Sequence, residues 1–374
     1  YNSYRGNASI SGPVIQDKLY LGAALQYKAS DGYMENLHYN DDKAAQLRHF
    51  NGRATLRWTP SQPWDISLIA DALNSDDKLG VFRYAKGPLA TDAHKIRHDE
   101  ISNDYSEDGN SQVLKINYAT EYFNITSVTG RAYRTYTKLT DSDCYDNPAS
   151  KFNNRFRYGD TQYTQELRIS SVKKGPLQWL GGLFGLYEDT DIDHKGMNAS
   201  RGLVSSRHTC DIETRGYAAF GQATYTLLDK LHFTVGLRLD NQNMDGDYYN
   251  PLNNVKVKED LSFSELLPKF SVSYDATKDV MAYATVAKGY LAGGFNWSTT
   301  SVNNKFHFDP EYCWNYEIGL KSNWLNNKLK ANFAMFYITM YDKQVRVLDP
   351  ESLLTTTTNA GQAYSYGFEV QLKA

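Results

Sequence analysis

Apolar and polar residues alternate strictly along several stretches of this chain. The stretch 231–240 places His232, Thr234, Arg238 and Asp240 between Leu231, Phe233, Val235, Leu237 and Leu239. The stretch 364–372 repeats the pattern, with Tyr364, Tyr366, Phe368, Val370 and Leu372 on one face. Because successive side chains of a β-strand point to opposite faces, each stretch predicts a strand with one apolar and one polar face.

Short turns and long polar segments separate the predicted strands in regular alternation. The turns lie at 16–18, 59–63, 119–121, 173–176, 228–230, 275–279 and 323–327, and polar segments such as 73–111 and 137–161 connect the resulting hairpins. We predict strands near 7–14, 19–27, 54–58, 66–70, 112–118, 122–136, 162–172, 178–187, 213–227, 231–242, 268–274, 280–288, 314–322, 329–342 and 364–372. These are about fifteen strands, and a tilted transmembrane strand needs about 9–11 residues.

This arrangement predicts an all-β fold, namely a transmembrane antiparallel up-and-down β-barrel. Every strand of such a barrel alternates, because its outside faces lipid and its inside is wet. The 29 tyrosines suit membrane interfaces, where the ring lies near lipid and the hydroxyl in the headgroups. In such barrels the short turns face the periplasm and the long loops face outward.

An odd number of strands is unexpected, since bacterial single-chain barrels have even counts. The sequence also starts as if inside a domain at Tyr1 and stops at Ala374 directly after a strand. We therefore interpret residues 1–374 as a single partial β-barrel domain that lacks strands at both ends.

Several short motifs resemble those of TonB-dependent outer-membrane receptors of Gram-negative bacteria. They are AKGYLAGGFN at 287–296, DPE at 309–311, WNYEIG at 314–319, YAAFGQATY at 217–225, NAG at 359–361 and GFE at 367–369, with ISGP, DKL and DGY near the start. The resemblance implies a barrel of about 22 strands that is filled by an N-terminal plug domain. The plug, which is absent from this chain, would carry the segment that binds the TonB energy-transducing complex.

The same resemblance implies active import of a scarce nutrient, with ferric siderophores as the family's commonest cargo. It implies no cofactor, and outer-membrane lipid as the surroundings. Two other functions stay open, a passive outer-membrane porin and a secreted soluble carbohydrate-binding β-protein. The net charge of −3 hides evenly spread acids and bases without a basic tract, so nucleic acid is not a predicted partner.

Two groups of residues are candidates for the transport site. Charges on the polar, inward faces would contact the plug, set ion selectivity in an empty pore, or be solvated wall charges; they are Arg53, Arg57, Glu166, Arg168, Arg238, Glu317, Lys321, Glu369 and Lys373. Candidate ligand-binding residues in the outer loops are Tyr290, Phe295, Trp297, Arg97, Arg155 and Arg157, where the arginines suit an anionic iron chelate. The aromatic residues could instead belong to the interfacial belt.

Cysteines and acidic residues offer few other sites. Cys144 and Cys210 both fall in predicted long loops on one side of the membrane, so a disulfide between them is possible. Two acidic runs could bind Ca²⁺ or merely solvate a loop: Asp141, Asp143 and Asp146, and Glu188, Asp189, Asp191 and Asp193. Neither has EF-hand spacing, so we predict no metal site. No G-x-S-x-G, P-loop or dinucleotide motif occurs, and we predict no enzymatic activity.

Overall fold

The computed structural model describes residues 2–78, 82–99, 104–146, 151–172, 175–298, 306–326, 328–348 and 355–374. Its main feature is one antiparallel sheet of 15 strands in the order β1-β2-β5-β6-β8-β9-β10-β11-β12-β13-β14-β15-β18-β19-β22. Each strand pairs with the next long strand along the chain, which is up-and-down topology. The predicted all-β fold and the count of about fifteen strands are both confirmed.

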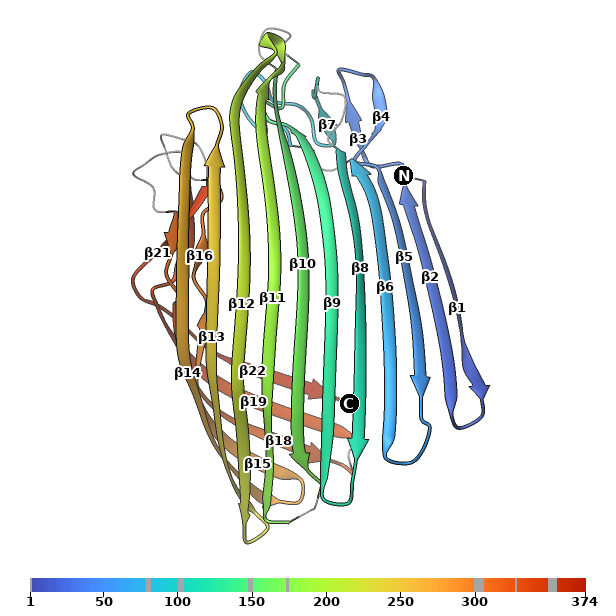
Figure 1. The fold of residues 1–374 in the computed structure, drawn as a ribbon, viewed down its shortest axis with the longest axis vertical. Helices are drawn as coiled ribbons and strands as arrows, with labels where there is room; N and C mark the ends of the chain where they lie inside the picture. Colours follow the sequence, from blue (N-terminus) through green and yellow to red (C-terminus); the bar gives the residue numbers. More distant parts are fainter. Residues whose placement is uncertain are drawn as a thin grey trace.

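The sheet curls into a trough whose far wall lies behind its near wall (Figure 1). Its strands are β1 (Ser3–Ile15), β2 (Leu19–Ser30), β5 (Leu47–Trp58), β6 (Trp64–Lys78), β8 (Asp104–Ala119), β9 (Phe123–Asp141), β10 (Phe152–Ser171), β11 (Leu177–Asn198), β12 (Leu203–Leu227), β13 (Leu231–Asn250), β14 (Val255–Thr277), β15 (Val280–Leu291), β18 (Glu311–Trp324), β19 (Leu329–Tyr341) and β22 (Ala363–Lys373).

Small elements gather at the long-loop end of the trough. Three minor sheets form there, from β3 (Met34–Asn36), β4 (Asp41–Ala44) and β7 (Lys95–Ile96), from β16 (Gly294–Phe295) and β17 (His307–Phe308), and from β20 (Gln344–Leu348) and β21 (Thr355–Asn359). In the described part of the chain the only helical element is the 3₁₀ turn η1 (Ala199–Arg201). None of the described residues forms a helix that is long and apolar enough to cross a membrane.

The short turns are tight enough to fix the register of the hairpins. Leu227 pairs with Leu231, and Leu228, Asp229 and Lys230 connect them. The first two of these connecting residues, Leu228 and Asp229, have φ of 52° and 56°. Positive φ at both central residues is the type I′ geometry, whose twist matches that of the flanking strands. Because register sets which face each side chain takes, such turns keep the apolar face of every strand on the same side.

The outer face of the sheet carries the apolar band. On β13, Phe233, Val235, Leu237 and Leu239 are 45–54% exposed, and Phe233 and Val235 pair with Val272 and Phe270 of β14. So much exposed apolar surface in register is what a lipid-facing band requires. Above Leu239 the same face continues as Asn241, Asn243, Asp245 and Asp247, so the outer boundary of the bilayer lies just above Leu239.

Several strands continue far beyond this boundary. β12 has 25 residues and β14 has 23, about twice the length needed for one crossing. The segments 137–161 and 188–212, which we predicted as loop, are therefore largely strand. The prediction is wrong because both faces of a strand are polar outside the bilayer, which removes the apolar–polar alternation.

The topology predicts which segments antibodies reach on intact cells. An epitope inserted after Gly87, in an exposed loop at the long-loop end, should be labelled from outside. An epitope inserted after Asp229, in the short β12–β13 turn, should be labelled only in permeabilised cells. Flow cytometry of both strains, with an outer-membrane fractionation control, measures this. Labelling of the Asp229 insertion alone would mean that the assigned orientation is reversed.

Candidate functional site: the concave face and its outer end

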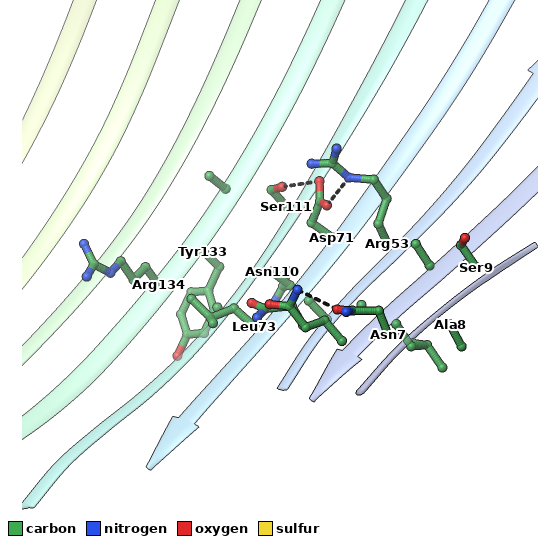
Figure 2. Close-up of a pocket in the computed structure, with 18 residues that line it drawn as sticks. Asn7, Ala8, Ser9, Arg53, Asp71, Leu73, Asn110, Ser111, Tyr133 and Arg134 are labelled. Atoms are coloured by element: carbon green, nitrogen blue, oxygen red, sulfur yellow. Dashed lines mark hydrogen bonds and ion pairs between the residues drawn. The ribbon is translucent and has the colours of Figure 1, made fainter. Parts of the chain in front are cut away.

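The concave face of the trough is hollowed beside β1, β2, β5, β6, β8 and β9, where polar side chains such as Arg53 and Asp71 lie beside apolar ones such as Leu73 (Figure 2). The hollow has a volume of about 630 Å³. On its floor, Arg53 Nε donates to Asp71 Oδ1 at 2.6 Å, and Ser111 Oγ donates to Asp71 Oδ2 at 3.4 Å. This network lies opposite the lipid-facing side, because Arg53 alternates with Ala54 and Leu56. The face can therefore hold polar groups of a ligand or of another domain.

The predicted inward charges lie on this concave face and largely pair with neighbours on the wall. Arg57 makes two hydrogen bonds to Asp65, at 3.0 and 2.8 Å. Arg238 Nε donates to Asp240 Oδ2 at 2.7 Å, and its guanidinium also lies 5.5 Å from the Phe184 ring. Such charge-assisted bonds hold the side chains in fixed directions toward the interior.

The remaining wall charges form looser contacts. Arg168 Nη1 lies 3.8 Å from Glu166 Oε1 on the same strand. Tyr283 donates to Glu317 Oε1 at 2.7 Å, and Lys321 Nζ lies 5.2 Å from the centroid of the Tyr283 ring. Glu369 and Lys373 lie on β22 and are exposed. That these charges contact a plug stays a prediction.

The segment after β15 folds onto the inner face of the extended strands. We call residues 292–298 and 306–309 the rim segment. Its aromatic side chains pack into the mouth cluster, in which Phe156 and Trp297 are partly buried and the other members are buried. The cluster consists of Phe156, Ile192, His194, His208, Cys210, Tyr248, Phe295, Trp297 and Phe306. Phe295 and Phe306 stack with ring centroids 4.7 Å apart, and Phe295 is only 7% exposed. The rim segment is thus held against the wall above the bilayer.

Two glycines make this close approach possible. A Cβ atom added to Gly246 of β13 would lie 2.7 Å from the Phe295 ring, closer than packed side chains allow. A Cβ atom on Gly293 would lie 2.7 Å from Cζ of Phe263. Gly246 and Gly293 thereby shape the base of this loop, since a larger residue at either position would hold the rim segment away from the wall.

Hydrogen bonds join the rim segment to the β20–β21 hairpin. Asn296 Nδ2 donates to the Thr357 carbonyl at 3.0 Å, and the Thr357 amide donates to Asn296 Oδ1 at 2.8 Å. Ser298 Oγ donates to the Thr355 carbonyl at 2.9 Å. The side chain of Asn296 thereby extends the hairpin edge, and movement of one segment must disturb the other.

Two histidines lie buried at the centre of the mouth cluster. His194 and His208 pair in register on β11 and β12, and their rings stack with centroids 5.6 Å apart. His208 Nδ1 is 2.7 Å from the Tyr248 hydroxyl, whereas His194 Nδ1 and His208 Nε2 contact no hydrogen-bond partner in the described ranges. Burial, followed by repulsion from His194, lowers the pKa of His208 to about 4, and burial lowers the pKa of His194.

Acidification should therefore loosen the rim segment. A histidine with a depressed pKa stabilises the packed state fully above about pH 6.5, the pKa of a free imidazole, and this contribution is lost as the pH falls toward 4. Two other charged groups lie nearby. The carboxylate of Asp193 partly opposes the lowering of the His194 pKa, and His307 Nδ1 lies 2.7 Å from Glu259 Oε1. Hydrogen exchange of 292–298, corrected for intrinsic rates, should rise between pH 6.5 and 4.5.

A matched variant isolates the two imidazoles as the cause. The double substitution His194→Gln and His208→Gln removes both titrating groups but keeps polar side chains of similar length. Its exchange should vary little over the same pH range. An equal rise in the wild-type protein and in this variant would contradict the assignment of the pH response to these two imidazoles.

The predicted ligand-binding aromatics lie at the outer end of the concave face. Tyr290 donates to Asp240 Oδ1 at 2.8 Å, while Phe295 and Trp297 belong to the mouth cluster. Trp297 packs against Phe156, with ring centroids 4.9 Å apart. These three residues are therefore brought to one end of the trough, and whether they bind a ligand stays a prediction.

The structure separates the predicted arginines from those aromatics. Arg97 pairs with Asp146 at 3.5 Å in the outer loops. Arg155 and Arg157, which we predicted in a loop, lie instead within β10. They flank Phe156, whose ring points into the mouth cluster, so both arginines project from the outer face. Their predicted loop position is wrong because β10 continues beyond the bilayer.

The possible disulfide is not formed in this structure, where Cys144 and Cys210 are free thiols. Cys210 lies within β12 rather than in a loop, and its side chain is fully buried in the mouth cluster. Cys144 follows β9 and takes a φ of 54° in the loop. Burial raises the pKa of Cys210 to about 12, so this thiol stays neutral and packs as a small apolar group.

The acidic residues are distributed differently from the two runs in the sequence. Asp141 and Asp143 meet Asp99, with carboxylate oxygens within 4.8 Å of one another, whereas Asp146 pairs with Arg97. Asp141 accepts the backbone amides of Asp99 and Cys144, and Lys151 lies 3.3 Å from Asp99. These contacts tie loops together within the chain. In the other run, Glu188 faces inward, whereas Asp189, Asp191 and Asp193 face outward, away from the trough.

Sequence reasoning missed several residues of the outer end. Asp240 accepts a hydrogen bond from Tyr290, and Glu265 accepts hydrogen bonds from Tyr312 and Lys288. His208 contacts the Tyr248 hydroxyl. One feature of the sequence points to His208 and Tyr248. Every second residue of β12 and β13 continues to face inward above the bilayer, and these inward positions include His, Cys and Tyr. That signal is faint, because the outward positions there are polar too.

Comparison with known proteins finds a matching family of β-barrels, related sequences and solved structures of the same fold. The sequence profile described as "TonB dependent receptor-like, beta-barrel" matches residues 70–374. The pesticin receptor of Yersinia pestis is 25% identical over 391 aligned residues, which cover 100% of this chain and 54% of that receptor. The chain thus spans about half the length of the curated relatives it matches.

Two solved structures share the fold. The crystal structure of the ferric yersiniabactin uptake receptor FyuA from Yersinia pestis superposes with a TM-score of 0.84 at 21% identity, covering 99% of this chain and 56% of that one. The siderophore receptor PiuA from Acinetobacter baumannii gives a TM-score of 0.76 at 16% identity, covering 98% and 59%. At these identities the likeness shows the arrangement of strands alone.

Proposed function

This chain belongs to the family of TonB-dependent receptor-like β-barrels of the Gram-negative outer membrane, and from that premise we propose that it forms part of the wall of a nutrient receptor. The receptor captures a scarce nutrient outside the cell and imports it with energy transduced by TonB. The observation that carries the proposal is the family match over residues 70–374.

A ferric siderophore is the proposed cargo. In support, one structural relative is a ferric yersiniabactin uptake receptor and another is a siderophore receptor. Tyr290, Phe295 and Trp297 would contact the cargo at the outer end of the trough, with Arg97 in the loops above. Arg155 and Arg157 are left out of this role, because they project from the outer face.

The inward charges fit contact with a plug domain. Arg57, Glu166, Arg168, Arg238, Glu317, Lys321 and Glu369 lie on the concave face and present groups that form charge-assisted hydrogen bonds. A plug in the trough would carry the TonB-binding segment, and residues 1–374 would act as one barrel domain. The family consists of transport receptors, and we propose that this chain performs no covalent chemistry.

Nutrient uptake by a deletion strain tests the proposal. Cells that lack the gene should lose uptake of one ferric siderophore from a panel of hydroxamate, catecholate and phenolate types, and the restored gene should return it. Cobalamin and maltooligosaccharides in the same panel serve as controls for general permeability. Unchanged uptake of every ferric siderophore, together with reduced uptake of another nutrient, would contradict the iron assignment. Reduced uptake of all small solutes would indicate a porin.

A further inference from the structure

The outer face of β10, β11 and β12 carries a row of three cations above the bilayer. Arg155 pairs in register with Lys195, and Lys195 pairs in register with Arg207. Arg157 lies two residues below Arg155 on the same face. The alternation runs without a bulge from these residues down to Leu167, Tyr187 and Tyr217 of the exposed apolar band, so all four cations face outward.

The positive charge of this row is mostly unmatched within the chain. Arg207 Nη2 lies 3.6 Å from Asp193 Oδ2, and Arg157 lies in register with the same aspartate on the same face, so Asp193 is the one acid directly beside these cations in the described β10–β12 register. In the parts of the chain that the structure describes, Arg155, Arg157 and Lys195 have no ion-pair partner. Like charges that lie directly opposite each other across two strands are destabilising. A row of three such cations on adjacent strands therefore favours an anion from outside the chain.

The height of the row narrows the choice of anion. Arg155 lies eight residues above Tyr163, and Lys195 lies eight residues above Tyr187, the last outward aromatics of their strands. At about 3.3 Å per residue and a tilt of about 35–45°, this places the row roughly 20 Å above the aromatic belt. Ordinary headgroups extend only about 5–8 Å beyond the hydrocarbon, so their phosphates lie too low.

The zone between the band and the row repels phosphate. Asp189, Asp191 and Asp193 of β11 face outward there, in register with Glu213, Asp211 and Thr209 of β12. Anions at headgroup height would meet these carboxylates, whereas anions held on sugars above them would meet the cations. The outer leaflet of a Gram-negative outer membrane is lipopolysaccharide, whose core sugars carry phosphate and carboxylate groups above the lipid.

We propose that Arg155, Lys195 and Arg207, with Arg157, bind the phosphorylated core sugars of lipopolysaccharide. Guanidinium groups suit this partner, because their planar N–H donors bind phosphate oxygens in pairs. The contact anchors the tall extension of β10–β12 to the surrounding leaflet, on the face opposite the mouth cluster. It is independent of the cargo, because no residue of the row faces the trough.

Binding of the full-length receptor to defined lipopolysaccharides tests this assignment. The probe is purified lipopolysaccharide with a phosphorylated core, compared with material from a strain that cannot phosphorylate the core. The variant is R155Q/K195Q/R207Q. The control is K256Q/K258Q on β14, whose outward lysines already contact the Tyr249 ring at 5.1 Å and Asp247 at 3.8 Å. Heat-modifiable gel migration confirms that both variants are folded.

The expected result is at least a tenfold loss of affinity in the triple variant, and little change in the control. The wild-type protein should prefer the phosphorylated core, and this preference should weaken as salt rises. Equal affinity of wild type and triple variant, or equal binding of both lipopolysaccharides, would overturn the proposal. Full displacement by millimolar inorganic phosphate would also overturn it, because the row would then be a site for free phosphate.

Discussion

The substitution Val235→Arg should destabilise the folded protein in lipid by about 2–4 kcal/mol, the cost of an arginine on the lipid face near the middle of a bilayer. Val235 is 51% exposed and lies halfway along the outward apolar set of β13. Its neighbours across the sheet are Ala223 and Phe270, so no acid on the same face is in register to pair with the new charge.

Thr234→Arg is the matched control, one residue away on the same strand. Thr234 faces the interior, where its hydroxyl lies 2.9 Å from that of Thr224, and an arginine there projects into water. We expect a loss of about 1 kcal/mol, equivalent to one hydrogen bond. Urea titration of both variants refolded into thin-bilayer vesicles measures the difference. Equal losses, or a larger loss for Thr234→Arg, would contradict the assignment of the two faces.

The substitution Phe295→Ala should release the rim segment and weaken capture of the cargo. A buried phenylalanine costs about 3–5 kcal/mol when truncated to alanine, and Phe295 stacks on Phe306 against Gly246. If the rim segment shapes the binding site, weakening its packing against the wall by about 3 kcal/mol lowers the affinity of the receptor for the siderophore by roughly 100-fold. Equilibrium binding of the transported siderophore and hydrogen exchange of 292–298 measure the two effects.

Phe82→Ala provides the comparison, because Phe82 is 59% exposed in another loop at the same end of the sheet. It should change neither affinity nor exchange of the rim segment by more than about twofold, as expected for a surface substitution. Faster hydrogen exchange in Phe295→Ala with unchanged affinity for the siderophore would mean that the rim segment does not shape the binding site. Unchanged exchange would contradict the docked arrangement itself.

The hairpins of the bilayer region were predictable from the sequence, because lipid imposes the alternation that sequence analysis reads. In β13, lipid requires Phe233, Val235 and Leu237 outside, and the watery interior tolerates Thr234 and Arg238 between them. The short turns were recognisable for the same reason, since they interrupt two such strands. The outward direction of the apolar set also gave the inward direction of Arg57, Glu166 and Glu317.

Above the bilayer the sequence lost its predictive value. There β10, β11 and β12 are polar on both faces, so strand was mistaken for loop, and Arg155, Arg157 and Cys210 were misplaced. The docking of Phe295 depends on Gly246, about fifty residues away along the chain, and local patterns carry no such information. The meeting of Asp99 with Asp141 and Asp143 likewise arises from long-range packing of loops.

Energy-dependent uptake tests the central claim most directly, namely that this wall belongs to an energised receptor. The measurement is accumulation of the identified iron-55 siderophore in cells with the intact receptor, with and without TonB, and before and after collapse of the proton gradient. Uptake should fall to the background of the receptor deletion in both de-energised conditions, while surface binding persists. Uptake that continues without TonB and without the proton gradient would contradict the account and indicate a passive pore.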